Sequence, residues 1–130
     1  MKLSDCIIMP DKVPVYIPDA HTGTVNQRLI GCEIGAKNLE VVLGTVTPGG
    51  QAEPHSHSNA EQVVYVLEGR IEVEMWGERQ VVNPGEIVYL PPGEVHRLST
   101  QGVSRAKVLV IYAPPIQSAA QPFQNKGRKS

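Results

Sequence analysis

Prolines and glycines recur along the whole chain and divide it into short segments, and this feature limits its fold more than any other. The sequence holds 11 prolines and 12 glycines in 130 residues, spread rather than clustered. Between them lie runs rich in Val, Ile, Leu and Tyr, and none of ten or more residues has a helical apolar period. The pattern predicts many short strands, tight turns and little helix.

The predicted strands follow one another closely in the second two thirds of the chain. Turns are expected where Gly supplies a positive φ or Pro presets φ, namely at Pro48–Gly50, Glu68–Gly69, Gly77–Glu78, Asn83–Gly85 and Pro91–Gly93. The strands are expected at Leu39–Thr47, Gln62–Leu67, Arg70–Trp76, Arg79–Val82, Ile87–Leu90, Val95–Ser99 and Arg105–Tyr112.

Two of these strands are apolar on both faces. In Ile71–Met75, apolar and acidic residues alternate, so one face meets a core and the other meets water. Val63–Leu67 and Val108–Tyr112 have no polar face, so their outer side needs a second cover. We expect a homodimer to provide it, and the alternative cover is an added N-terminal strand at Val13–Ile17.

Composition excludes several classes of partner. The formal net charge is −1 with signs evenly mixed, which indicates neither a nucleic-acid partner nor an anionic membrane surface. The apolar runs are too short to span a bilayer, and the first residues lack the pattern of a signal peptide. Cys6 and Cys32 fit reduced thiols rather than a disulfide. We therefore expect a cytoplasmic protein.

Three histidines are spaced as metal ligands would be. His55 and His57 are separated by one residue, so on an extended strand both imidazoles point the same way. His96 follows the predicted turn at Pro91–Gly93. Three imidazoles and one oxygen donor can hold a first-row divalent metal and leave positions open for substrate or water. His21 belongs to no such pattern and is predicted to lie in a loop.

Two blocks of the sequence resemble the two signature motifs of the cupin superfamily, specifically the small single-domain cupins. The residues in register with the first motif are Gly49, His55, His57 and Gly69, and those in register with the second are Gly85, Pro91, Gly93 and His96. The resemblance covers residues 39–112. It implies an all-β fold, the double-stranded β-helix or jelly-roll β-barrel, with a metal inside one end.

Length and composition set the expected domain boundaries, and the same resemblance assigns the fourth ligand. We expect a single barrel domain at residues 1–116 and a flexible polar C-terminal tail at 117–130. The position usually held by a carboxylate falls on Gln62, and some single-domain cupins use glutamine there. Glu61, one residue away, would replace it only if a bulge turned the strand. Thr100 stands where the second motif often ends in Asn.

The implied site is one divalent transition metal (Fe, Mn, Ni, Cu or Zn) held by His55, His57, Gln62 and His96. This ligand set is neutral, so the ion would keep its full charge and act strongly as a Lewis acid. Counting inward from the ligands predicts a mainly aliphatic wall. The polar or aromatic candidates near it are Tyr89, Tyr112, Trp76 and Arg97, of which Arg97 is expected to face outward.

We expect a metal-dependent enzyme, an oxygenase, isomerase or lyase, that acts on a small organic acid, ketone or enol. Open coordination positions on a Lewis acid favour this hypothesis. The alternative is a non-catalytic cupin that binds or senses a small molecule, and the scarcity of acid–base residues favours it. The fold alone does not decide between the two.

Overall fold

The computed structural model describes residues 1–18, 21–52, 57, 59–100 and 104–116. His55 and the C-terminal tail, residues 117–130, therefore lie outside the described residues. Short 3-10 helices occupy Leu3–Cys6 (η1), Pro10–Lys12 (η2) and Cys32–Ile34 (η3). The strands are β1 (His21–Ile30), β2 (Glu40–Ala52), β3 (Glu61–Glu68), β4 (Ile71–Met75), β5 (Glu78–Val82), β6 (Ile87–Leu90), β7 (His96–Ser99) and β8 (Ala106–Ala113).

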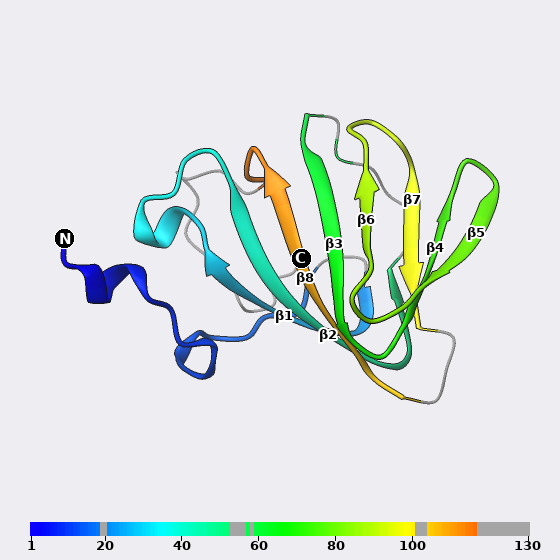
Figure 1. Ribbon diagram of the computed structural model, residues 1–130, viewed down its shortest axis with the longest axis horizontal. Coiled ribbons are helices and arrows are strands. Elements are labelled where there is room, and N and C mark those ends of the chain that lie inside the picture. Colours follow the sequence, from blue (N-terminus) through cyan, green and yellow to red (C-terminus); the bar gives the residue numbers. More distant parts are fainter. Residues whose placement is uncertain (19–20, 53–56, 58, 101–103, 117–130) are drawn as a thin grey trace.

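These strands form one antiparallel sheet that curls into a nearly closed barrel (Figure 1). The hydrogen-bonded order is β5-β4-β7-β2-β8-β3-β6, with β1 paired to β2. Apart from the pairs β4–β5 and β1–β2, neighbours in this order are not consecutive in the sequence, as a jelly roll requires. The predicted fold class, an all-β jelly-roll barrel, is confirmed.

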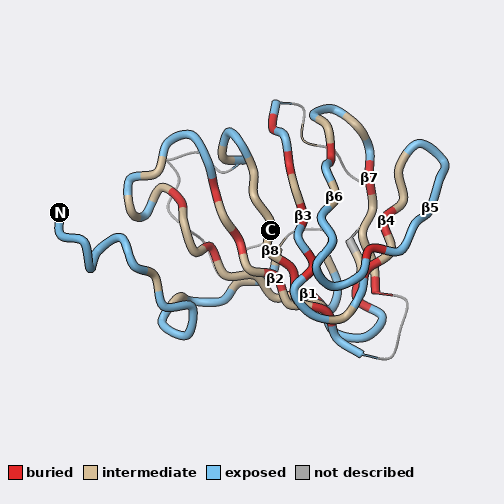
Figure 2. Tube along the Cα trace, viewed as in Figure 1, coloured by how far each residue is buried: buried red, intermediate tan, exposed pale blue. Residues whose placement is uncertain are grey.

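The core fills the inside of the barrel with alternate residues of the central strands. On β3, Val64 and Val66 are buried, and on β4 Ile71 and Val73 are buried, while their sequence neighbours face outward. Figure 2 shows the buried positions as short red segments separated by more exposed ones along the strands. The predicted alternation in Ile71–Met75 is therefore correct.

The strand β2 changes neighbours part of the way along its length. Its first half pairs with β8, and Gln51 in its second half pairs with Ser99 of β7. Opposite β1, the register jumps across Thr47–Gly50, which bulge out of the ladder. The backbone N–H of Thr100 donates to the Gly50 carbonyl over 3.0 Å and holds this bend. The bend carries one strand from one half of the barrel to the other.

Two sequence predictions need correction here. The predicted turn at Pro48–Gly50 does not end a strand, because it is the bulge inside β2. No part of β1 was predicted. His21, which was predicted to lie in a loop, is the first residue of this strand. The strands from β3 to β8 agree with their predicted positions to within one or two residues.

The N-terminal segment does not form the added strand that we considered as a cover. Within Val13–Ile17, only Tyr16 makes a bridge, to Asn26 of β1. Both cysteines are free. Among the described residues, no helix has the length and apolar character needed to cross a bilayer.

Gly69 gives a test of this fold, because it meets two separate constraints. Its φ is +72°, and an added Cβ would collide with the carbonyl oxygen of Arg105. Gly77 has nearly the same φ, +75°, but nothing near its Cβ position. Gly77→Ala should cost about 1–2 kcal/mol from the backbone alone. Gly69→Ala should cost at least about 1 kcal/mol more in urea unfolding. Equal losses would contradict the close approach of β8 to this turn.

Candidate metal centre

Four elements bring polar side chains to the same end of the barrel. His57 precedes β3, Gln62 is near the start of β3, His96 begins β7, and Tyr112 is near the end of β8. This end lies at the top of Figure 1. The ring centres of His57 and His96 are 5.8 Å apart, and the Tyr112 ring meets His57 edge-on at 5.4 Å. Residues far apart in the sequence therefore converge.

A backbone hydrogen bond joins the two sequence motifs. The N–H of Gly93 donates to the carbonyl oxygen of His57 over 3.0 Å. Gly93 has a φ of +81°, which lets the Pro91–Gly93 turn present this N–H to the neighbouring loop. The turn predicted from the second motif thus positions the backbone of a histidine from the first.

The orientation of the His96 ring is set by the residue two positions before it. Nδ1 of His96 lies 3.2 Å from the carbonyl oxygen of Glu94, so Nδ1–H donates there and Nε2 keeps its lone pair. The Glu94 carboxylate also accepts a 2.6 Å hydrogen bond from Nε1 of Trp76. His96 is 2% exposed, and its Nε2 is buried inside the barrel. This is the tautomer that a metal ligand needs.

Gln62 faces inward and Glu61 faces outward. The Gln62 side chain is 4% exposed, whereas Glu61 is exposed. Oε1 of Gln62 is buried, and no hydrogen-bond donor reaches it among the described residues. A buried acceptor without a donor is costly, roughly 1–3 kcal/mol. A bound cation or a substrate hydroxyl at this atom would remove that cost.

The donors that the structure describes fit a divalent ion. The Nε2 atoms of His57 and His96 and the Oε1 atom of Gln62 are all buried at this end of the barrel. Rings whose nitrogens lie about 2.0–2.1 Å from one ion can have centres 5.8 Å apart. No three His, Cys, Asp or Glu side chains form a metal-binding group in the described ranges. The predicted ligand set includes His55, which lies outside those ranges. Its oxygen donor is the side-chain amide of Gln62.

Tyr112 contributes a phenol beside the histidines. Partial burial, together with the nearby Tyr16 and Glu40, raises the pKa of this phenol above its usual value. The phenol is therefore protonated at neutral pH and can donate a hydrogen bond or a proton.

A cavity of about 70 Å³ lies inside the barrel, and Gln62 and Tyr112 are among the residues that line it. One part of its wall is aliphatic, with Val64, Leu98 and Val110 among its residues, as the sequence predicted. The rest is polar and is contributed by β1, β2, β3, β7 and β8 at His21, Thr24, Asn26, Gln51, Gln62, Ser99 and Tyr112. The polar part is larger than the sequence indicated.

Several sequence candidates lie elsewhere. Tyr89 and Trp76 are 51% and 64% exposed, so neither lines the cavity. Arg97 faces outward, as predicted, and donates to Oε1 of Gln51 over 2.9 Å. Sequence reasoning missed His21, which is among the residues that line the cavity, because β1 itself was missed.

A buried ion pair stands beside Tyr112. Arg28 on β1 and Glu40 on β2 are 5% and 2% exposed, and their side chains meet at 3.1 Å. Arg28 also pairs with Glu33 at 2.9 Å, and the second Glu40 oxygen accepts the N–H of Ile116. Because two carboxylates hold Arg28, this guanidinium is not available to bind a substrate acid.

Comparison with known proteins gives a family and several relatives. Residues 42–112 match the family described as Cupin domain. The chain is 31% identical over 114 residues to germin-like protein subfamily 2 member 2 of Arabidopsis thaliana, covering 79% of this chain and 52% of the relative. It is 28% identical over 92 residues to polyketide synthase CurC of Streptomyces cyaneus, covering 71% and 60%.

A solved structure is similar at the level of the whole barrel. The polyketide cyclase RemF from Streptomyces resistomycificus superposes with a TM-score of 0.76 at 28% identity, covering 82% of this chain and 78% of that one. The chain spans about half the length of the germin-like relative.

Replacing Gln62 tests whether its buried amide oxygen serves a ligand rather than the fold. In chelator-treated protein, Gln62→Met should leave the free energy of unfolding unchanged or raise it by up to about 1 kcal/mol, because a buried acceptor without a donor is removed.

Gln27→Met is the matched control for this experiment. The Gln27 amide donates to the carbonyls of Pro10 and Val13 over 2.6 and 3.0 Å, so this change should lower stability by about 1 kcal/mol. A loss at Gln62 as large as that at Gln27 would contradict the assignment.

Proposed function

Because the chain belongs to the Cupin domain family, we propose that it is a metal-dependent enzyme whose ion is held by His55, His57, Gln62 and His96. The observation that carries this proposal is the buried Oε1 of Gln62, which has no donor among the described residues and lies on the strand that follows His57. Glu61 points outward and is not part of the proposed set.

The ligand set determines the chemistry of the site. A divalent ion bound by three imidazoles and one amide would supply a strong Lewis acid for a carbonyl, enolate or carboxylate oxygen. Fe, Mn, Ni, Cu and Zn are all suited to these donors. The carbonyl oxygen of Glu94 helps by fixing which nitrogen of His96 faces inward.

The walls of the cavity favour a small, partly apolar substrate with several oxygens. Val64, Leu98 and Val110 would contact its carbon skeleton, and the polar residues that β1 brings to the wall would hydrogen-bond its oxygens. CurC and RemF are named as a polyketide synthase and a polyketide cyclase. On this likeness, we propose an enolisable ketone and an isomerase or lyase reaction rather than an oxygenase.

Two side chains of the cavity wall would handle protons. Tyr112 keeps its proton at neutral pH, so its phenol would donate to the oxygen that gains charge when an α-proton leaves. Among the described residues that line the cavity, His21 is the titratable side chain besides Tyr112, and we assign its imidazole the role of accepting the α-proton. The aliphatic walls would keep bulk water from the enolate.

Metal content tests the ligand set directly. Protein purified without chelator should carry about one divalent ion per subunit by elemental analysis, and His55→Ala and His96→Ala should each remove most of it. Glu61→Gln, an exposed neighbour of the same strand, should keep wild-type content. Near-stoichiometric metal in both histidine variants would refute the site.

Proton exchange tests the reaction class. The metal-loaded protein should accelerate deuterium incorporation at the α-carbon of a 3-oxo ester, followed by NMR, without consuming oxygen. Tyr112→Phe should slow exchange at least about a hundredfold while keeping its metal. Tyr89→Phe, an exposed tyrosine, should not change the rate. Oxygen uptake coupled to turnover would favour an oxygenase, and tight ligand binding without exchange would favour a binding module.

A further inference from the structure

Gly44 stands in the middle of β2, at a position where the backbone does not require a glycine. Each of the other described glycines has either a positive φ or a Cβ position closer than 3.0 Å to a neighbouring atom. A Cβ at Gly44 would lie 3.1 Å from Oδ1 of Asn26 and 3.3 Å from a methyl carbon of Val108. A glycine inside a strand lowers stability, because it loses more conformational freedom on folding and has no side chain to pack. Its presence therefore needs another reason.

The reason that the structure offers is the cavity inside the barrel. Gly44 is buried on β2, and cross-strand pairing places Asn26 of β1 on one side of it and Val108 of β8 on the other. All three residues line the cavity. A cavity needs roughly 10–15 Å³ to hold one water molecule, so about 70 Å³ leaves room for only a few non-hydrogen atoms. A methyl group at this position would displace one of them and narrow the space around it.

Gly44 lies at the end of the cavity away from the proposed metal ligands. At the ligand end, the register pairs Gln62 with Tyr112, and Tyr112 with Glu40. From Glu40, the chain runs four residues along β2 to reach Gly44, which is about 13 Å at the rise of a strand. Since Gln62, Tyr112 and Gly44 all line the same cavity, it extends from the ligand end into the barrel.

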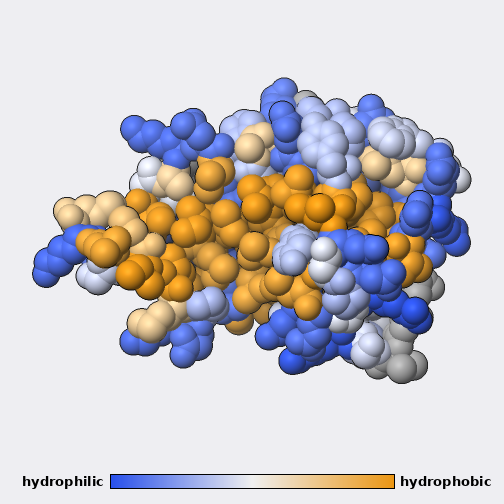
Figure 3. Space-filling model, in the orientation of Figure 1, coloured by the Kyte–Doolittle hydropathy of each residue, from blue (hydrophilic) through white to orange (hydrophobic). Residues whose placement is uncertain are grey.

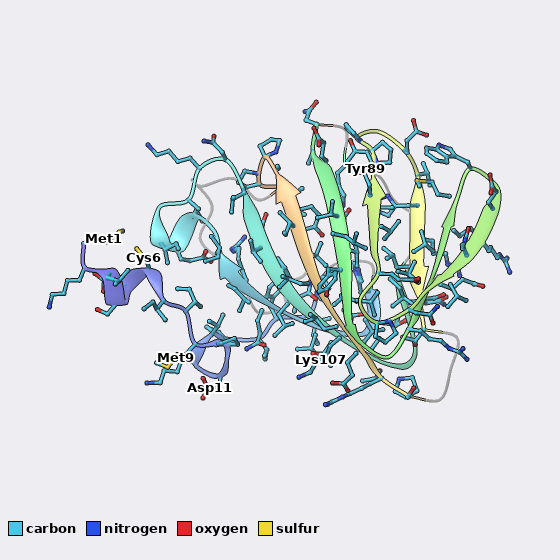
Figure 4. The ribbon with its side chains drawn as sticks, viewed as in Figure 1. Met1, Cys6, Met9, Asp11, Tyr89 and Lys107 are labelled. Atoms are coloured by element: carbon cyan, nitrogen blue, oxygen red, sulfur yellow. The ribbon has the colours of Figure 1, made fainter. Side chains whose placement is uncertain are left out.

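Figure 4 labels a residue near each of these two levels. Tyr89 precedes Leu90, which is the partner of Gln62 on β6, and it lies toward the top of the molecule. Lys107 precedes Val108, the partner of Gly44, and it lies toward the bottom. The cavity therefore runs along the barrel rather than across it. With so small a volume over this length, it admits a slender chain.

A hydrogen-bonding group stands beside the space that Gly44 leaves open. Oδ1 of Asn26 is the atom nearest to the missing Cβ. The backbones of Asn26 and Tyr16 exchange two hydrogen bonds of 2.8 Å, and a further hydrogen bond joins their side chains. The amide of Asn26 is therefore held in place at the wall of the cavity. An amide can bind either a carbonyl or a hydroxyl group.

The distribution of polar groups on this wall favours a ligand in the cavity. Figure 3 shows apolar side chains across the front of the barrel, whereas Thr24 and Asn26 line the cavity within it. Polar groups cost free energy when they are buried, unless hydrogen bonds compensate for the loss of water. An oxygen on a bound molecule supplies such a bond at this depth.

We propose that Gly44 limits the length of the substrate and that Asn26 binds an oxygen at its far end. Both roles rest on the proposed function, because they place the reacting carbons near Tyr112 and the rest of the chain toward Gly44. The substrate class is then a short, unbranched 3-oxo acid or ester with a second carbonyl or hydroxyl group remote from the metal. Gly44 and Asn26 determine specificity and take no part in proton transfer.

The stability of Gly44→Ala tests whether the glycine serves the cavity rather than the backbone. In metal-free protein, the urea midpoint should stay unchanged or rise, because alanine is favoured over glycine inside a strand. Gly50→Ala is the matched control on β2, since its Cβ would lie 2.7 Å from a methyl carbon of Val46 and 2.9 Å from the Gly23 carbonyl oxygen. It should lower the midpoint. A loss at Gly44 as large as that at Gly50 would overturn the proposal.

Substrate length is tested by deuterium exchange in metal-loaded protein with two 3-oxo esters. One has a four-carbon chain, and the other has a six-carbon chain with a second carbonyl at carbon five. Gly44→Ala should lower the acceleration for the longer ester at least about tenfold relative to the shorter one, since one methyl group in a tight pocket discriminates roughly 10–200-fold. The ratio cancels differences in folding and metal content. Val41→Ile, on the outward side of β2, should keep the wild-type ratio. An unchanged ratio in Gly44→Ala would overturn the length limit.

The role of Asn26 is tested by removing the second carbonyl from the longer ester. The wild type should prefer the ester that carries it by about fivefold, the worth of one hydrogen bond, and Asn26→Leu should abolish this preference. A preference that survives in Asn26→Leu would refute the contact.

Binding separates a failure of these roles from a failure of the proposed function. If the wild type accelerates no exchange, the proposed function fails, and binding of the same esters is then measured by NMR line broadening, which needs no reaction. Binding of the longer ester at least about tenfold weaker in Gly44→Ala would still support the length limit. Equal binding by the two proteins would overturn it.

Discussion

The strand β3 serves two surfaces at once, because side chains along a strand alternate between its faces. Gln62, Val64 and Val66 point into the barrel, where they reach the cavity and the core. Val63 and Tyr65, between them, point to the outer face of the sheet. A register slip of one residue would exchange these sets and destroy the cavity and the outer face together. The pairing of β3 with β6 and β8 fixes that register over most of its length.

The inner side of β1 differs from that of β3, because most of its inward side chains are polar. Thr24 and Arg28 are buried, and Asn26 lines the cavity between them. Burying a guanidinium is tolerable only when its charge and donors are matched, and Glu33 and Glu40 provide this match. Removing either Arg28 or Glu40 alone would leave a buried charge next to Tyr112. The buried charged groups in this part of the barrel are therefore stabilised by pairing with one another rather than by contact with water.

Sequence alternation predicted the strands from β3 onward because each carries Val, Ile or Leu toward the core. It failed for β1, where the inward positions are Thr24, Asn26 and Arg28 and the usual apolar pattern is inverted. His21 was missed for the same reason. Pro48–Gly50 has the composition of a turn, and it is a bulge because β2 pairs with β1 on both sides of it, Val46 with Thr24 and Gln51 with Thr22. The inward direction of Gln62 was predicted from the motif resemblance and agrees with its burial, but the assembly of all four proposed ligands remains a prediction, since His55 lies outside the described residues.

The hydrogen bond from Gly93 to His57 has a consequence for how the chain folds. It closes a loop between distant segments, so the proposed ligand cluster cannot assemble by local contacts and must await the pairing of β3, β6 and β7. An ion that binds only the closed barrel adds its binding free energy to folding, about 2.7 kcal/mol at a hundredfold excess over the dissociation constant. Under the proposed function, metal supply would then affect the stability of the folded chain as well as its chemistry.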